Sequence, residues 1–251
     1  DGFTPVVDGF DHIKFGDLAQ LQKTIKTNTA AVLVEPIQGE GGIKVMPTTF
    51  LKGVRKLCDE FGLLLMFDEV QCGMGRTGKL CAYEWSGVTP DIMALAKGLG
   101  GGFPVGACLT TEAVGSLMTA GTHGSTFGGN PLAMAAANAV LDIILENDFL
   151  AKVNEIADYL NENLVKLATK FPRCISGVRG LGLMVGLQFS NVHGNIKINA
   201  KLRELGMLSV VASDNILRLV PPLIITKVEV DEATQFLEEA IEQVYLSEKN
   251  E

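Results

Sequence analysis

The chain has 251 residues, 47% hydrophobic and 20% charged, enough for one large or two smaller folded domains and too apolar for a disordered protein. Its 21 Lys and Arg against 29 Asp and Glu argue against nucleic acid or an anionic membrane as main partner, and no apolar run reaches the roughly 18–20 residues of a membrane helix. The five scattered cysteines and three histidines predict free thiols in the cytoplasm and no metal site.

The first part of the chain has the alternating pattern of an α/β domain. Residues 1–16 have the composition of a loop and an edge strand. The continuous apolar runs 30–34 and 63–67 predict buried parallel strands, because such strands are covered on both faces. A loop at 38–42 and a helix over 47–61 connect them, which predicts a right-handed βαβ unit.

The expected helix over 47–61 carries its own signals. Thr48 or Thr49 should cap its N-terminus, since a hydroxyl can accept a free N–H of the first turn. An apolar stripe at helical spacing should face the sheet, and it comprises Leu51, Val54, Leu57 and Cys58.

Two short strands and a long helix follow. Segments 92–96 and 105–109 predict strands, and the glycine-rich stretch 98–102 lies between them. Pro131 should begin a helix that continues to about residue 146, because proline is favoured at the first helical position. Small side chains on this helix leave room for close packing against the sheet: Ala133, Ala136, Ala137 and Val140.

The pattern changes after Asn147, and we place a domain boundary near residues 147–150. Residues 1–148 would then be the C-terminal part of a large domain, and residues 149–251 a small C-terminal domain. The second part has an α+β order. Helices are expected over 150–170, 195–205 and 229–247, and strands within 178–189 and near 208–211 and 216–219.

A carboxylate and an amine stand where two expected strands end. The apolar run 61–67 leads into Asp68, and the run 91–96 leads into Lys97 and the glycines after it. In open α/β sheets, ligands bind outside the carboxyl ends of the strands. Ordinary alternatives are a turn for Asp68 and a water-exposed amine for Lys97. If the Lys97 amine is desolvated, its pKa falls and it can form a Schiff base, while Asp68 could keep a pyridine ring protonated.

Residues 124–131 combine hydroxyls and glycines directly before a helix. This arrangement suits an anion such as phosphate, although it is also an ordinary helix start at a proline. Neither glycine run matches a nucleotide-binding loop, because no GxxxxGKS/T occurs and 98–102 is not a clean GxGxxG. A dinucleotide-dependent oxidoreductase is therefore disfavoured.

Arg218 is an isolated arginine in a short apolar segment that ends in two prolines. Such a residue is usually exposed, but it could also hold a substrate carboxylate through two parallel hydrogen bonds. Glu35 and Glu40, at and beyond the end of the first strand, could compete with that carboxylate for the guanidinium.

Five long motifs occur in order along the chain: FDEVQ (67–71), GMGRTG (73–78), GVTPDI (87–92), AKGLGGGFPVG (96–106) and GTHGSTFGGNP (121–131). Together they resemble the class III pyridoxal-phosphate aminotransferases over nearly the whole chain. The resemblance implies an α/β, fold-type I transferase, with a mostly parallel large domain, here incomplete, and an α+β small domain. Within the class, the motifs are most similar to acetylornithine-type members, which implies transfer of an amino group from N2-acetylornithine to 2-oxoglutarate in arginine biosynthesis.

The resemblance also assigns roles to residues. Lys97 would form the Schiff base with pyridoxal 5'-phosphate and then move the substrate proton, and Asp68 would pair with the pyridinium nitrogen. Further cofactor contacts would come from Glu69, Val70, Gln71 and Thr126, the last toward the phosphate held by the partner subunit of a homodimer. Substrate contacts would come from Ser125, Arg218, Glu40 and, in second place, Glu35.

The chain also differs from the family pattern. Members carry an earlier phosphate-binding turn, a ring-stacking aromatic and a substrate-binding arginine, none of which can be located here, so we expect an N-terminal part to be absent. Two alternatives stay open: an enzyme for another ω-amine (ornithine, succinylornithine, 4-aminobutyrate or putrescine), and an inactive fragment that retains the fold.

Overall fold

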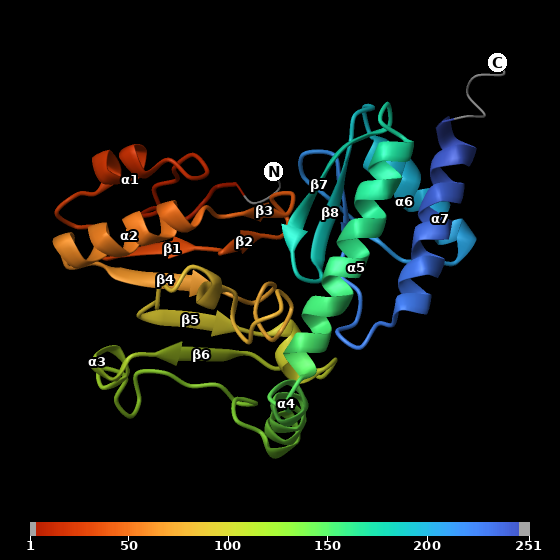
Figure 1. Ribbon diagram of the computed structural model, residues 1–251. Coiled ribbons are helices and arrows are strands. Elements are labelled where there is room, and N and C mark those ends of the chain that lie inside the picture. Colours follow the sequence, from red (N-terminus) through yellow and green to blue (C-terminus); the bar gives the residue numbers. More distant parts are fainter. Residues whose placement is uncertain (1–3, 246–251) are drawn as a thin grey trace.

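Two separate four-stranded sheets organise the chain and lie side by side (Figure 1). The computed structural model describes residues 4–245. The first sheet comes from the N-terminal half of the chain and the second from the C-terminal half, and the strand order differs between them. A two-stranded hairpin of β2 (Ile37–Gln38) and β3 (Lys44–Val45) lies where the halves meet.

The first sheet has the order β1-β4-β5-β6. β1 (Ala31–Val34), β4 (Leu64–Asp68) and β5 (Ile92–Leu95) are parallel, whereas β6 (Ala107–Thr110) pairs antiparallel with β5 at the edge. All four expected strands are therefore confirmed, with boundaries shifted by one or two residues. The carboxyl ends of the three parallel strands share one edge of the sheet.

One face of this sheet is covered by helices. α2 (Thr48–Phe61) buries its predicted apolar stripe against the sheet, with Leu65 and Phe67 in the same core. The predicted threonine cap is wrong: Pro47 is the N-cap residue and no side chain caps the helix, because both threonines already lie inside it. α1 (Leu18–Thr24) was not predicted; it is short, and residues 4–16 before it contain no strand.

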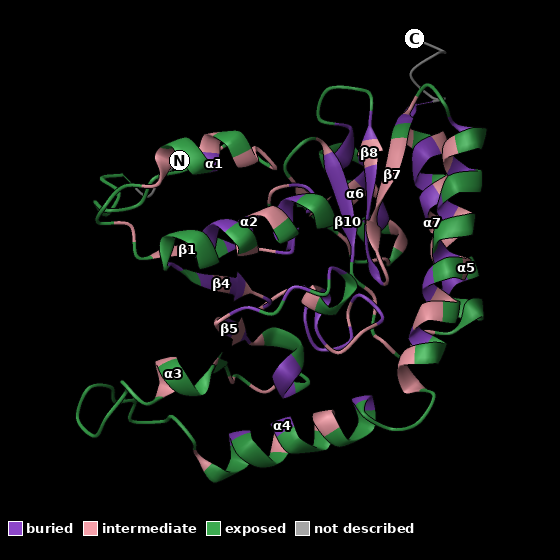
Figure 2. Cartoon of the chain, turned by 60° about the vertical axis from the view of Figure 1, so that its left-hand side comes forward, coloured by how far each residue is buried: buried purple, intermediate pink, exposed green. Residues whose placement is uncertain are grey.

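The opposite face of the first sheet is open among the described residues. Strand side chains alternate between faces, and Leu33 on this face is 62% exposed whereas Leu65 on the covered face is fully buried. α4 (Pro131–Ile144) starts at the expected proline and buries Ala133 and Ala137. Its other residues are mainly exposed, as Figure 2 shows. Ala137 shares a core with Met93 and Leu95 of β5, and Met93 is the register partner of Phe67, so α4 packs on the covered face and the expected packing toward the sheet is confirmed.

Three short elements join the strands of the first half. They are the 3-10 helices η1 (Ala82–Trp85) and η2 (Lys97–Gly100) and the helix α3 (Glu112–Gly115). The hairpin of β2 and β3 occupies the segment expected to be a loop, and its turn contains residues 39–42.

The second sheet is antiparallel throughout, with the order β7-β8-β10-β9. Its strands are β7 (Ile175–Leu181), β8 (Met184–Phe189), β9 (Val210–Ala212) and β10 (Ile216–Leu219). It packs with α5 (Phe149–Lys170), α6 (Gly194–Leu205) and α7 (Lys227–Tyr245) around a single core. The expected elements are thus present, while residues 246–247 of the last predicted helix lie outside the described residues. The boundary placed near 147–150 falls between α4 and α5 and stays a prediction as a domain boundary.

Candidate active site

The carboxyl ends of the parallel strands bring three ionisable side chains to one edge of the first sheet. Glu35 directly follows β1, Asp68 ends β4, and Lys97 begins η2, with one residue between it and β5. The strands run in register, with Val34 opposite Phe67, so Glu35 and Asp68 leave the sheet side by side. This is the edge at which ligands bind in open α/β sheets.

Glu35 shows how close these groups lie. Its carboxylate accepts the backbone N–H of Gly39 at 3.2 Å. Burial raises the pKa of Glu35, and the negative charge of Asp68 raises it further, while the Gly39 hydrogen bond and the positive charge of Lys97 lower it. Two acids and one amine therefore interact electrostatically at this edge.

Asp68 takes part in a turn as well as in this cluster. Its Oδ1 accepts the backbone N–H of Val70 at 3.0 Å, which confirms the ordinary turn alternative. Among the described residues, no donor contacts the other carboxylate oxygen of Asp68. That oxygen remains available to a cation or a protonated nitrogen.

Lys97 has an unusual backbone. Its φ of +45° lies in the left-handed region, which costs a residue other than glycine roughly 1–3 kcal/mol. The side chain lines a cavity of about 590 Å³ together with Gln71 and Arg76. The expected desolvation of the amine is not observed, because Lys97 is exposed and the described residues leave its side chain accessible to solvent.

Arg218 is buried, so the ordinary alternative of an exposed arginine does not hold. Only 7% of it is exposed, because it lies in the central strand β10 of the second sheet. Its Nη1 contacts Glu40 at 2.6 Å and donates to Oε1 of Gln71 at 3.0 Å, while its buried Nε has no hydrogen-bond partner among the described residues. Glu40, rather than Glu35, is thus the acidic partner that holds the guanidinium.

Gln71 connects this ion pair to the first sheet. Its Oε1 accepts a hydrogen bond from Arg218 Nη1. The hydrogen bond from Arg218 is the largest cause that lowers the pKa of Glu40, and Gln71 lowers it further. The backbone of Gly39 passes so close that a Cβ there would lie 2.1 Å from Gln71 Oε1. A side chain at position 39 would therefore have to displace the Gln71 side chain.

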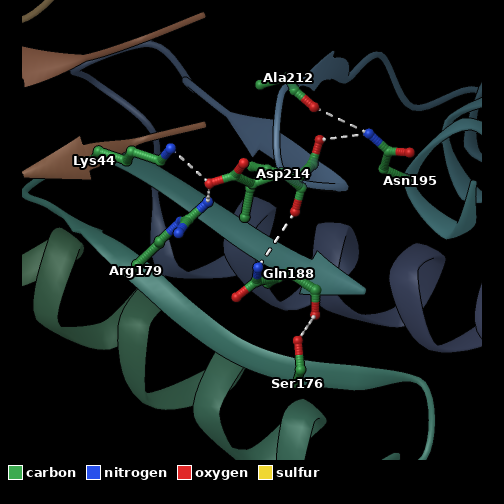
Figure 3. A network of polar contacts seen from close by, with 8 residues as sticks. Lys44, Ser176, Arg179, Gln188, Asn195, Ala212 and Asp214 are labelled. Carbon is green, nitrogen blue, oxygen red and sulfur yellow. Dashed lines mark hydrogen bonds and ion pairs between the residues drawn. The ribbon is translucent and has the colours of Figure 1, made fainter. Parts of the chain in front are cut away.

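The turn that carries Glu40 belongs to the hairpin of β2 and β3, and this hairpin is held by contacts with the second sheet. Lys44 Nζ and Arg179 Nη2 both contact Asp214 Oδ2, at 2.8 and 3.2 Å (Figure 3). Ile43 is fully buried with Met184 and Ile216. Hydrophobic and ionic contacts together fix the turn that carries Glu40.

The remaining candidates differ in their surroundings. Glu69 is fully buried, and its two carboxylate oxygens accept the N–H groups of Ala82 and Tyr83 at 2.6 and 2.7 Å, so this side chain caps η1 and does not line the cavity. Burial raises its pKa to about 7. Val70, beside it, is half-buried.

Ser125 and Thr126 lie apart from Lys97. Both are exposed, in the loop that precedes α4, and neither lines the cavity. The start of α4 is an ordinary cap: Asn130 Oδ1 accepts the N–H of Ala133 at 2.9 Å. A role for the two hydroxyls in phosphate or substrate binding stays a prediction.

Arg76 is the residue at this site that received no role from the sequence. It lines the same cavity as Lys97 and donates to two backbone carbonyls of the second half of the chain. The motif at 73–78 contained it, but a glycine-rich motif gives no direct sign of a long-range contact.

Within the described part of the chain, no cluster of three or more His, Cys, Asp or Glu side chains is suited to a metal ion. No helix of that part is long and apolar enough to cross a membrane.

Comparison with known proteins identifies the family. The family model for class-III aminotransferases matches residues 8–241. The chain belongs to this family. Among curated relatives, it is 55% identical to the acetylornithine aminotransferase of Mesorhizobium japonicum over 93% of this chain and 58% of that protein. It is 51% identical to that of Brucella melitensis over 98% of this chain and 61% of that protein.

Solved structures of the family share the fold. The N-acetylornithine aminotransferase of Stenotrophomonas maltophilia matches with a TM-score of 0.87 and 38% identity, over 95% of this chain and 63% of that one. The ornithine aminotransferase of Toxoplasma gondii matches with a TM-score of 0.90 and 34% identity, over 98% of this chain and 59% of that one. The fold is therefore that of the fold-type I transferases, and the chain spans about 60% of the length of these relatives.

Proposed function

We propose that this protein is an aminotransferase that transfers the ω-amino group of N2-acetylornithine to 2-oxoglutarate, with pyridoxal 5'-phosphate as cofactor, in arginine biosynthesis. The arrangement of Asp68 and Lys97 at neighbouring strand ends, together with 55% identity to an acetylornithine aminotransferase, supports this proposal. All five cysteines lie within the described residues and none of them forms a disulfide there, which fits a reducing compartment such as the cytoplasm.

The carboxylate of Asp68 and the amine of Lys97 suit the ring and the aldehyde of pyridoxal phosphate. Bound there, the cofactor would supply a protonated ring that acts as an electron sink. One carboxylate oxygen of Asp68 accepts no hydrogen bond among the described residues and could accept one from a protonated ring nitrogen. Lys97 has an accessible amine and a strained backbone. Val70 and Gln71 follow Asp68 on the same loop and would border the ring.

Substrate binding would use Arg218 as a carboxylate clamp. Its guanidinium is pre-positioned by Glu40 and Gln71. A substrate carboxylate could take the place of Glu40, whose side chain is 75% exposed and can move into solvent at low cost. One site could thereby accept glutamate or 2-oxoglutarate in one half of the reaction and an ω-amine, with Arg218 neutralised by Glu40, in the other. Lys97 Nζ would hold and deliver the transferred proton.

We also propose a homodimer whose subunits share the site. Exposed apolar side chains gather on α4 and just before it, and they include Phe127, Leu132, Met134 and Ile143. Ser125 and Thr126 lie in the exposed loop beside this surface. Two copies joined there would bury apolar area and bring these hydroxyls toward the partner's cofactor.

The test uses the protein as encoded by its gene, incubated with pyridoxal phosphate. Wild type should form a coloured adduct and convert N2-acetylornithine in the presence of 2-oxoglutarate. Lys97→Ala should lose both the lysine-linked absorbance band and turnover, whereas Lys166→Ala, which removes an exposed lysine on α5, should keep them. An absorbance band that survives in Lys97→Ala would refute the assigned role.

Ornithine is the second candidate amino donor. It is favoured by one observation, a TM-score of 0.90 to ornithine aminotransferase, although the identity to that protein is 34%. A panel of N2-acetylornithine, ornithine, succinylornithine, 4-aminobutyrate and putrescine would decide between donors by their kcat/KM.

A further inference from the structure

The loop over residues 73–78 connects the two halves of the molecule. It follows β4 and Gln71 along the chain, and it is held by hydrogen bonds to its own neighbours: Gly73 N–H donates to Glu69 O at 2.9 Å, and Gly75 N–H donates to Leu80 O at 3.0 Å. Because these hydrogen bonds hold the loop in a fixed conformation, residues that contact the loop are held at a fixed place relative to the first sheet.

Arg76 makes the contact with the second half. Its Nη1 donates to Pro221 O at 2.5 Å and to Leu183 O at 3.2 Å, and Leu183 N–H donates back to Arg76 O at 3.0 Å. No carboxylate forms an ion pair with Arg76 among the described residues. Burial lowers its pKa to about 10, so the guanidinium stays charged at neutral pH and is stabilised by carbonyl dipoles.

Two further contacts close this interface. Gly182 has a φ of +59°, and a Cβ there would lie 2.5 Å from the backbone of Thr77, so only glycine allows this close approach. Asn154 Nδ2, on α5, donates to Gly78 O at 2.8 Å. The 73–78 loop is thus gripped by three separate segments of the second half.

Two of the three segments that contact the loop are connected to Arg218. Pro221 lies three residues after Arg218 on the same chain segment. Leu183 directly precedes β8, in which Gly186 is the register partner of Arg218. Gln71, two residues before the loop, therefore contacts Arg218 directly, and the loop itself holds the start of β8 and the segment that follows β10.

We propose that Arg76 is a positioning residue that fixes Arg218, and with it the site for a substrate carboxylate, at a set distance from Lys97 and Asp68. This inference rests on the proposed function, because it concerns how the carboxylate of an amino-acid or oxo-acid substrate is placed. Displacement of such a clamp by about 1 Å can cost up to a hundredfold in rate, so a modest shift should be measurable.

The main test compares Arg76→Met with Arg76→Lys in the full-length holoenzyme. Arg76→Met should raise the KM for 2-oxoglutarate by about tenfold and change kcat less, because the clamp moves while Lys97 stays. Arg76→Lys, which keeps an ammonium donor for the same carbonyls, should recover part of the loss. An unchanged KM in folded Arg76→Met would overturn the inference.

Controls separate positioning from general destabilisation. Leu237→Ala empties a fully buried site in the core of the second half, far from the loop along the chain. It should lower the unfolding temperature and leave the KM at the wild-type value. Arg203→Met removes an exposed arginine and should change neither. A KM increase in Leu237→Ala as large as that in Arg76→Met would overturn the inference.

Two readouts do not require turnover. In the 251-residue chain, the single tryptophan, Trp85, donates to both O and Oγ1 of Thr77 at 3.2 Å, so the fluorescence of this chain reports on the loop. Arg76→Met should shift this emission to the red, and the Kd for glutarate, an unreactive dicarboxylate, should rise as the KM does. A wild type that binds glutarate but does not transaminate would refute the proposed function alone, whereas unchanged glutarate affinity in Arg76→Met would refute the positioning role.

Discussion

The two sheets differ in how completely their side chains are buried. In the antiparallel second sheet, all four residues of β10 are buried and the core is closed by three helices. In the mostly parallel first sheet, one face carries exposed leucines, and the chemical groups stand at its edge. The second sheet supplies rigidity, and the first supplies accessible functional groups. Arg218 is the exception that connects them, since it is a polar group held inside the rigid sheet.

The largest effect should come from equal truncations in the two sheets. Leu217→Ala, in β10, removes a fully buried side chain and should lower the free energy of unfolding by roughly 2–5 kcal/mol. Leu33→Ala, in β1, removes one that is 62% exposed and should cost less than about 1 kcal/mol. Urea unfolding of the 251-residue chain, followed by circular dichroism, measures both. Equal costs would mean that the open face is covered in solution.

Arg218→Ala should mainly damage function. Loss of the buried clamp should lower kcat/KM for 2-oxoglutarate roughly a hundredfold, about 2.7 kcal/mol of transition-state stabilisation. Arg173→Ala, outside the site, is the matched control and should retain activity. Steady-state kinetics on the full-length holoenzyme measure the difference, and a loss of tenfold or less would show that another group binds the carboxylate.

Glu69 should make the free energy of unfolding of the first half depend on pH. Its pKa is raised from 4.5 to about 7 in the folded chain, because burial outweighs its two hydrogen bonds. The folded state then binds the proton more tightly, so this stabilisation is complete below about pH 4.5 and is lost as the pH rises through about 7. Between pH 5 and 8 the change in the free energy of unfolding should be roughly 2.5 kcal/mol. Glu69→Gln should flatten the profile of unfolding free energy between pH 5 and 8, and a slope as steep as in wild type would assign the effect to another group.

The smallest effect should come from the ionic contact behind Glu40. The pKa of Asp214 is lowered chiefly by its hydrogen bond from Lys44, so its stabilisation is present above the unfolded pKa and is lost as the pH falls through the lower folded value. Because Asp214 is 39% exposed, Asp214→Asn should cost less than about 1 kcal/mol, and less still at high salt. Thermal unfolding at low and high salt tests this, and a salt-independent cost would point to packing instead.

Local sequence patterns were sufficient to predict the fold and the residues at the carboxyl ends of the strands. Apolar runs and glycine positions indicated the strands on which Asp68 and Lys97 stand, and an acid near Arg218 could be expected from charge alone. The short helix α1 was missed because its signal is brief. The direction of the Glu69 side chain and the exposure of Lys97 depend on tertiary packing, which the sequence pattern does not encode. Arg76 was missed for the same reason, since its partners are backbone carbonyls more than a hundred residues away.

The pair of Glu40 and Arg218 has a consequence for how the site is made. Its two residues are separated by 178 positions, and closing so long a segment costs chain entropy that local contacts do not offset. During synthesis, the acid leaves the ribosome long before the arginine. We therefore expect the pair of Glu40 and Arg218 to form late, in the step that joins the two sheets, so that a nascent chain contains Lys97 before the Arg218 guanidinium is in place.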